Sequence, residues 1–217
     1  MDNTVNHMNC CVVDGETYLG NQEADLSNQR FWNQKWENKE TGWDIGYASP
    51  VITAYMDQYV NKDAAILIPG CGNAHEASYL LENGFTNITL IDIAPAAVAT
   101  LKEKFSGNKQ VKVLCEDFFL HEGQYDLIIE QTFFCAISPS RRAEYVSKAA
   151  SLLNENGKII GVLFDREFNY TFPPFGGSVG EYKSLFNNYF TIKTMNACYN
   201  SISPRANSEV FINLVKR

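Results

Sequence analysis

From residue 64 to its end, the chain alternates between short apolar runs and longer helical patterns. Helical patterns of about 10 to 15 residues between strand-like runs are typical of a mainly parallel sheet with crossover helices. The last two runs are separated by the turn-forming residues 199–208, which predicts an antiparallel hairpin at the sheet edge. We therefore predict an α/β fold: a Rossmann-like, seven-stranded, mainly parallel sheet with a terminal antiparallel hairpin and helices on both faces.

These patterns place each element along the chain. We predict strands at 64–69, 87–93, 111–115, 125–130, 158–164, 190–198 and 209–215. We predict helices at 51–59, 74–82, 95–105, 141–153 and 179–187. Pro95 suits the first position of a helix, where its missing N–H would be unpaired in any residue. Gly84 and Gly157 suit left-handed residues that follow helix ends.

Length and composition bound the domain organisation. A chain of 217 residues is long enough for one domain with a sizeable core and short for two. Residues 1–27 are polar and aperiodic, so we expect an arm that is either flexible or covers the ligand of the domain. Residues 28–217 are expected to form that single domain.

Charge and cysteine usage exclude several classes of partner. The chain has 18 basic and 25 acidic residues and a net charge of −7, without a basic stripe, so we expect no nucleic-acid partner. The first twenty residues lack the apolar core of a secretory signal, and no run approaches the ~20 apolar residues of a membrane span. We expect a cytoplasmic protein without a membrane partner. Six cysteines without a C-x-x-C pair, and histidines distant from them in sequence, argue against a metal site.

A glycine turn follows the first predicted strand, in the sequence Pro69-Gly70-Cys71-Gly72, and a helix pattern begins directly after it. Glycines allow a tight turn and the close approach of a ligand to the backbone. The free N–H groups at the start of a helix favour an anionic or carboxylate-bearing ligand. This turn therefore predicts one wall of a ligand site.

Two acids follow the next strands. Asp92 ends the second strand 20 residues after Gly72, where a carboxylate can accept hydrogen bonds from the hydroxyls of an adenosine ribose. Asp117 ends the third strand beside Phe118, and the pair suits the amino group and the face of an adenine. His75 stands at the third position of a G-x-G-x-x-G pattern, and its bulk argues against a dinucleotide.

Aromatic residues after the fourth strand favour a methyl donor over a dinucleotide. Glu130 and Gln131 are followed by Phe133 and Phe134. Aromatic faces attract a sulfonium cation without supplying a nucleophile that would compete for its methyl group. We therefore predict S-adenosyl-L-methionine as the cofactor, with S-adenosyl-L-homocysteine as its product.

Residues 30–190 resemble the thiopurine S-methyltransferase superfamily, and most closely its thiol, halide and thiocyanate methyltransferase branch. The tryptophans of FWNQKWENKETGW match the family's spacing in the segment that covers the cofactor. The segments PGCG, LIDI and CEDFF look like its cofactor contacts, and QTFFCAISPSRR looks like its motif after the fourth strand. With the motifs above, the resemblance implies the cofactor-binding residues Trp32, Trp36, Trp43, Gly70, Cys71, Gly72, Asp92, Ile93, Asp117, Phe118, Glu130 and Gln131.

The resemblance also implies an acceptor site. Arg142 falls where the family places an arginine near the acceptor, and we give it the catalytic role. We expect Phe134 and Phe175 to contact the substrate, with Phe133 and Trp43 also lining the pocket. Residues 169–180, rich in proline, glycine and aromatics, are expected to form a loop over the site.

Departures from the family pattern leave the acceptor open among a thiol, a thiopurine, thiocyanate and a halide. Gln131 stands where halide-directed members carry an aromatic residue, and Phe175 where plant halide enzymes have tyrosine. Methyl transfer from a sulfonium is an in-line displacement that needs alignment and the exclusion of water, and little acid or base help.

Two alternatives remain. An O- or N-methyltransferase would need a general base, for which Glu130 and His121 are the candidates, and a binding module would hold the cofactor without turnover. We expect a small-molecule acceptor as the partner of a monomer or weak dimer.

Overall fold

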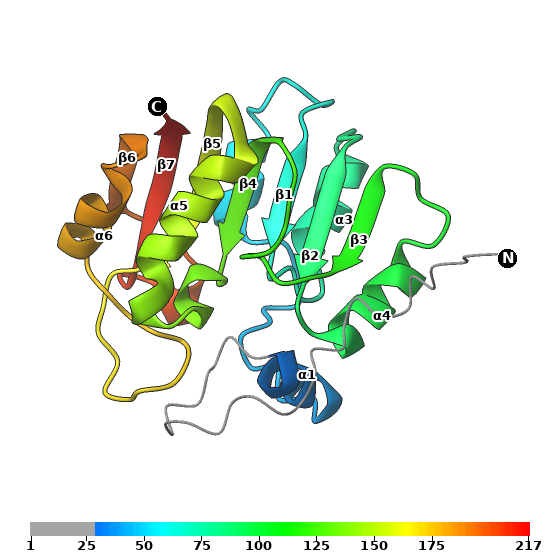
Figure 1. The fold of residues 1–217 in the computed structure, drawn as a ribbon, viewed down its shortest axis with the longest axis horizontal. Helices are drawn as coiled ribbons and strands as arrows, with labels where there is room; N and C mark the ends of the chain where they lie inside the picture. Colours follow the sequence, from blue (N-terminus) through cyan, green and yellow to red (C-terminus); the bar gives the residue numbers. More distant parts are fainter. Residues whose placement is uncertain (1–28) are drawn as a thin grey trace, which may run out of the picture.

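The computed structural model describes residues 29–217, so the arm predicted for residues 1–27 lies outside the described part of the chain. The described strands form one seven-stranded sheet in the order β3-β2-β1-β4-β5-β7-β6 (Figure 1). The strands are β1 (Ile66–Pro69), β2 (Ile88–Asp92), β3 (Val111–Cys115), β4 (Tyr125–Gln131), β5 (Leu153–Phe164), β6 (Phe190–Ala197) and β7 (Glu209–Lys216). Neighbouring strands from β3 to β5 are parallel, and β7 pairs antiparallel with both β5 and β6. This confirms the predicted sheet and its terminal hairpin.

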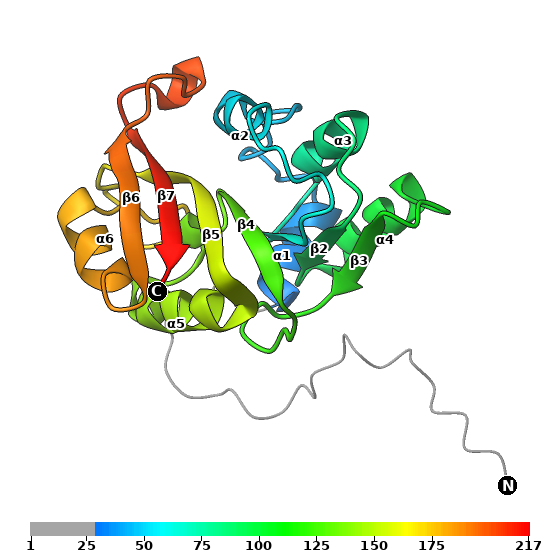
Figure 2. The ribbon, with the colours of Figure 1, turned by 90° about the horizontal axis from the view of Figure 1, so that it is seen from above.

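Helices cover both faces of the sheet, as Figure 2 shows from above. They are α1 (Gln29–Glu37), α2 (Pro50–Met56), α3 (His75–Glu82), α4 (Pro95–Lys104), α5 (Arg142–Leu152) and α6 (Val179–Phe186), with short 3-10 turns η1 (Phe134–Ala136), η2 (Pro139–Arg141) and η3 (Ser203–Arg205). Apolar residues of α5 and α6 share one buried cluster with the sheet. Residues of α2, α3 and α4 share another with the opposite face. Among the described helices, none is long and apolar enough to cross a bilayer.

Gly84 and Gly157 were predicted as left-handed residues that follow the ends of helices. Gly84 follows α3 with a φ of +82°, and the Phe85 N–H donates to the Leu80 carbonyl at 3.0 Å, which closes the helix as predicted. The prediction for Gly157 is wrong. The left-handed residue is its neighbour Asn156, with a φ of +60°, and both residues lie inside β5, which begins directly after α5. Asparagine tolerates this conformation better than most residues, so no glycine is needed there.

Helix α1 was not among the predicted elements, and it carries no buried residue. It lies beyond the carboxyl ends of β1 and β2 (Figure 1). A hydrogen bond joins it to the sheet domain, because the Asn33 side-chain oxygen accepts the Ala96 N–H at 2.8 Å. Ala96 belongs to the first turn of α4, whose N–H groups have no partner inside their own helix.

The strand order reverses beside β1. From β1 the chain moves outward to β2 and β3, and it then returns to the other side of β1 to form β4. Loops leaving β1 and β4 therefore run in opposite directions and leave a crevice at the carboxyl ends of these strands. Ligands of open α/β sheets bind at such a point, so the topology places the candidate site there.

Candidate active site

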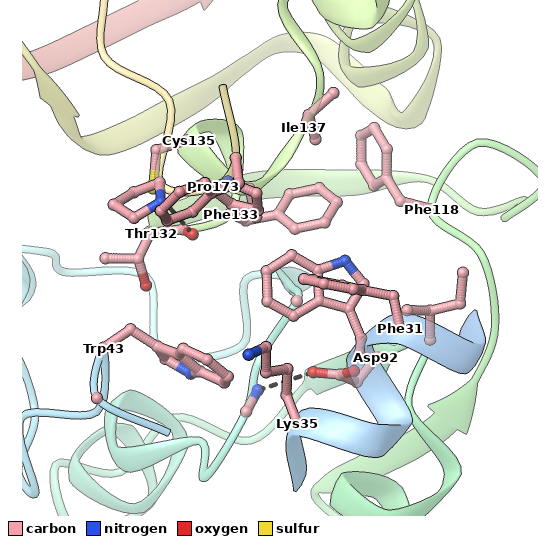
Figure 3. Close-up of a pocket in the computed structure, with 18 of the residues that line it drawn as sticks. Phe31, Lys35, Trp43, Asp92, Phe118, Thr132, Phe133, Cys135, Ile137 and Pro173 are labelled. Carbon is pink, nitrogen blue, oxygen red and sulfur yellow. Dashed lines mark hydrogen bonds between the residues drawn. The ribbon is translucent and has the colours of Figure 1, made fainter. Parts of the chain in front are cut away.

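A cavity of about 680 Å³ occupies this crevice (Figure 3). Its walls come from α1, the glycine turn after β1, the ends of β2 and β3, the turn after β4, the loop after β5, and η3. Its volume lies within the usual range of small-molecule sites. Most of the predicted cofactor contacts line it: Trp32, Trp36, Trp43, Gly70, Gly72, Asp92, Ile93, Asp117 and Phe118.

The glycine turn owes its shape to two left-handed residues. Gly70 and Gly72 have φ angles of +55° and +52°. A β-carbon built on Gly70 would overlap the ring of Phe133, and one built on Gly72 would lie 3.3 Å from Cζ2 of Trp36. The backbone of this turn is therefore packed against the two aromatic side chains that continue the cavity wall.

Asp92 holds the glycine turn from the end of β2. Its carboxylate accepts the Gly72 N–H at 3.0 Å, the bond drawn in Figure 3, and the Ala94 N–H at 2.9 Å. Burial raises the pKa of Asp92, and these backbone hydrogen bonds oppose that rise. An ionised carboxylate has about four lone-pair sites, so acceptor capacity remains for a ligand hydroxyl.

The end of β3 forms a flat apolar slot beside a carboxylate. Phe118 is 3% exposed, and its ring stacks on Tyr145 at 5.2 Å and meets Phe133 edge-on at 5.2 Å. Ile93 and Asp117 line the same part of the cavity. An apolar slot bordered by a carboxylate is suited to a nucleobase with an exocyclic amino group.

The three tryptophans of the chain meet at the cavity. Trp43 lies edge-on to Trp32, with ring centroids 5.6 Å apart, and to Trp36, with centroids 6.0 Å apart. The turn that carries Trp43 is held by Asp44, which bonds the side chains of His75, at 2.8 Å, and Asn73. The tryptophans thus form an aromatic cover over the glycine turn.

Two predicted cofactor contacts lie just outside this cavity. Cys71 and Gln131 line a smaller neighbouring cavity of about 50 Å³. Burial raises the pKa of Cys71 well above its usual value, so its thiol stays neutral. Cys135, which does line the main cavity, has a pKa raised by burial to about 12, so it is not a nucleophile that would compete for a methyl group.

Four other predicted site residues line neither cavity. Glu130 is fully buried, and Phe134 is 1% exposed within the core. Arg142 is 2% exposed and donates to Glu181 and to the Gly176 carbonyl, both at 2.7 Å. The Phe175 N–H donates to the Cys135 carbonyl at 2.7 Å. These residues lie behind the walls and brace them.

His121, the other candidate general base, is also placed away from the cavity lining. It is 2% exposed, and its two ring nitrogens lie 2.9 Å from Glu116 Oε2 and 2.8 Å from the Tyr125 hydroxyl. Glu130 accepts the N–H groups of Phe133 and Phe134 and the Tyr145 hydroxyl, so both bases considered for an O- or N-methyltransferase are engaged in internal hydrogen bonds.

Sequence reasoning missed the basic and aromatic residues at the β5 and β7 side of the cavity. The guanidinium of Arg166 lies 4.8 Å from the centroid of Phe168, and that of Arg205 lies 5.8 Å from Phe164. Phe168, Tyr170 and Phe172 stack in succession, with centroids 5.2 Å and 4.4 Å apart. The spacing of these aromatics was a usable signal, whereas Arg205 lies in a stretch that resembles a plain hairpin connection.

The fold and the site together define a class of protein. A switch-point cavity with a glycine turn, an acid at the end of β2, and an apolar slot beside the acid after β3 is the site of an S-adenosylmethionine-dependent methyltransferase. The structure of 1,6-didemethyltoxoflavin-N1-methyltransferase from Burkholderia thailandensis, solved with S-adenosylhomocysteine, shares the fold with a TM-score of 0.72 and 16% identity. The match covers 94% of this chain and 93% of that one.

Sequence comparison shows the family. Residues 27–213 match the family model described as thiopurine S-methyltransferase, so the chain belongs to that family. Probable thiol methyltransferase 2 from Arabidopsis thaliana is 31% identical over 159 residues, which cover 71% of this chain and 70% of that protein. Thiocyanate methyltransferase 1 from Brassica oleracea is 26% identical over 159 residues, with the same coverage. The chain is thus an S-adenosylmethionine-dependent methyltransferase.

Proposed function

We propose that the enzyme methylates the sulfur of a small organic thiol that carries an aromatic body and a negative charge. The observation that carries this proposal is the exposed guanidinium of Arg166 among the rings of Phe164, Phe168 and Phe172. Arg205 lies beside it, but its guanidinium donates to the Trp43 carbonyl at 2.9 Å and lies 3.7 Å from the Glu209 carboxylate, so it supports the wall of this part of the cavity. Guanidinium groups bind carboxylates and thiolates, and aromatic rings stack on a flat acceptor.

The sheet order separates this cluster from the cofactor contacts. Asp92 and Asp117 follow β2 and β3, whereas Arg166 follows β5 and Arg205 precedes β7, across the switch point. The acceptor and the adenosine would then approach the methyl group from different sides, as an in-line displacement requires. The residues that hold the donor and exclude water supply the alignment, and the donor itself supplies the methyl group.

A thiol fits the chemistry of the site better than an alcohol or an amine. Thiols ionise near pH 8.5 without help, and aromatic thiols ionise more readily. An alcohol needs a base at the reacting oxygen, and Glu130 and His121 are both bonded inside the core. The similarity to a probable thiol methyltransferase supports the same acceptor atom.

Labelled methyl transfer tests the acceptor. Purified enzyme with methyl-labelled S-adenosylmethionine is given 4-mercaptobenzoate, thiophenol, thiocyanate, iodide and 4-hydroxybenzoate in parallel. We expect kcat/KM to be about tenfold higher for 4-mercaptobenzoate than for thiophenol, and Arg166→Gln to remove most of that preference. Faster transfer to thiocyanate, to iodide or to the hydroxyl of 4-hydroxybenzoate would contradict the proposal.

We also propose that the enzyme is cytoplasmic and acts as a monomer, or at most a weak dimer, on small molecules. Its net charge of −7 disfavours nucleic acid as a partner. Light scattering should give a mass near 24.5 kDa at micromolar concentration, and fractionation should recover the protein with the soluble contents of the cell. A stable dimer or membrane-bound protein would contradict this.

A further inference from the structure

Glu130 is a buried acid whose carboxylate is the acceptor in each of its hydrogen bonds. It lies near the end of β4 and is fully buried. One oxygen, Oε1, accepts the N–H groups of Phe133 and Phe134, both at 2.8 Å. The other, Oε2, accepts the Tyr145 hydroxyl at 2.9 Å. Within residues 29–217 it forms no ion pair, so these donors alone stabilise its charge.

The groups held by Glu130 shape two walls of the cavity. The turn after β4 includes the left-handed Thr132, with a φ of +60°, and carries Phe133 against Gly70. Residues 132, 133 and 135–137 all line the cavity. On the other side of the carboxylate, the ring of Tyr145 stacks against Phe118. In the view of Figure 3, Phe133 and Phe118 lie on one side of the cavity and Asp92 on the other.

A buried charge without a counter-ion is costly unless its hydrogen bonds are complete. An apolar or amide side chain at the end of β4 would avoid this cost. The carboxylate instead collects two successive peptide N–H groups on one oxygen, a geometry that fixes the start of η1. Glu130 is therefore placed to hold the turn after β4, which forms the cavity wall facing the methyl donor.

We propose that Glu130 is a positioning residue for methyl transfer, whose ionised carboxylate clamps the turn bearing Phe133 and the ring of Tyr145, and so sets the shape of the cofactor cavity. The inference concerns the cofactor side of the site and rests on the methyltransferase class. It does not depend on which acceptor the enzyme uses.

Protonation weakens this clamp. All three partners donate, so a protonated Glu130 must turn its own O–H toward Tyr145, whose hydroxyl proton then loses its acceptor. Hydrogen bonds to a neutral acid are also weaker than those to a carboxylate. Burial raises the pKa of Glu130 to about 7, so both forms are populated near neutral pH. The titratable side chains of Tyr145 on α5 and Cys135 on η1 interact electrostatically with it, and burial raises the pKa of both.

The test measures S-adenosylhomocysteine affinity against pH, so it needs no acceptor. Calorimetric titrations of the full chain run from pH 5.5 to 8. We expect the wild-type affinity to rise by about fivefold across this range, the difference between a neutral and a charge-assisted hydrogen bond. Glu130→Gln, which resembles the protonated acid in shape and charge, should show the low-pH affinity throughout, with a flat profile.

Two further variants separate positioning from a general loss of structure. Tyr145→Phe removes one bond that stabilises the carboxylate, so the midpoint of the wild-type profile should move to higher pH. Asp126→Asn is the matched control, because Asp126 also accepts a backbone N–H, that of Ala65 at 2.9 Å, at the far end of β4. It should keep the wild-type profile.

If the affinity for S-adenosylhomocysteine depends on pH in the same way in wild type and Glu130→Gln, the proposal is overturned. An unmoved midpoint in Tyr145→Phe would also overturn it, and this variant decides the question if Glu130→Gln does not fold. Failure of thiol methylation would leave these titrations unchanged, so the acceptor proposal and the positioning proposal are tested separately.

Discussion

Gly70 is required for two reasons, its backbone conformation and the space next to its α-carbon. Its φ of +55° strains any residue with a β-carbon, and that β-carbon would overlap the Phe133 ring. The space is taken by the Phe133 ring, which belongs to the turn that Glu130 holds. The glycine motif therefore reflects the packing of a distant strand end as well as the approach of a ligand.

Substitution of Gly70 separates these requirements. Overpacking costs about 1–3 kcal/mol, so we expect Gly70→Ala to weaken S-adenosylhomocysteine binding by about tenfold in calorimetry. Gly107→Ala is the control, since Gly107 also has a positive φ, +75°, but nothing lies within 4 Å of an added β-carbon. It should lower the free energy of unfolding by about 1–2 kcal/mol and leave binding unchanged. Equal losses of binding would argue against the contact with Phe133.

Side-chain direction was the part of the site that the sequence did not reveal. Strand ends identified Asp92 and Asp117, because the carboxyl ends of parallel strands share one edge of the sheet. Glu130 and Phe134 were placed in the same crevice, but both point into the core. Most of β4 is buried, on both faces of the sheet, so its residues show no alternation that would tell cavity from core.

Among the elements, the strands were the most predictable. Each described strand overlaps a predicted one, because buried parallel strands are short apolar runs that turn-forming residues separate. Helix α1 was left out of the predicted helices because Trp32 and Trp36 were assigned to the cofactor, although their spacing of four residues also suits an amphipathic helix. Its tryptophans face the ligand cavity, and their spacing indicated binding more clearly than it indicated a helix.

The contact between α1 and α4 includes a side-chain hydrogen bond that a single substitution removes, which makes the docking of α1 testable. We expect Asn33→Ala to remove the acceptor of the Ala96 N–H, lower the free energy of unfolding by about 1 kcal/mol and weaken S-adenosylhomocysteine binding by about fivefold. The reason is that Trp32 and Trp36 reach the cavity from this helix. Tryptophan fluorescence provides the titration signal.

Glu37→Ala is the matched control for α1. Glu37 accepts a hydrogen bond from the Asn33 side chain at 2.7 Å and is exposed to solvent. Its loss should leave binding within about twofold of wild type, as expected for an exposed hydrogen bond. If both variants bind alike, α1 is held by its tryptophans and not by the bond to α4.

At the scale of the whole molecule, the sheet order distributes the chemistry. Asp92 ends β2 and Asp117 follows β3, whereas the guanidinium groups of Arg166 and Arg205 lie on the β5 and β7 side of the cavity. The net charge of −7 conceals this arrangement, because most charges lie elsewhere on the surface. Composition correctly indicated a globular chain, but only the fold shows where its charged residues lie relative to the cavity.

Glu130 links the site to the stability of the entire chain. Burial raises its pKa from 4.5 to about 7 in the folded protein. Below about pH 4.5 the group is protonated in both states, so its contribution to stability is complete. As the pH rises, the unfolded chain ionises first, and stability is lost until the folded protein ionises as well, near pH 7. One pKa unit is worth about 1.4 kcal/mol, so the full loss is about 3 kcal/mol.

Glu130→Gln does not ionise and escapes this loss. Urea denaturation of both proteins at pH 5 and pH 8 should show the free energy of unfolding of the variant, relative to wild type, increasing by about 2 kcal/mol between the two conditions. A constant difference would mean that the acid ionises in the folded protein as easily as in the unfolded chain. The same substitution should flatten the binding profile, so the charge that strengthens the cofactor cavity is also the charge that destabilises the fold.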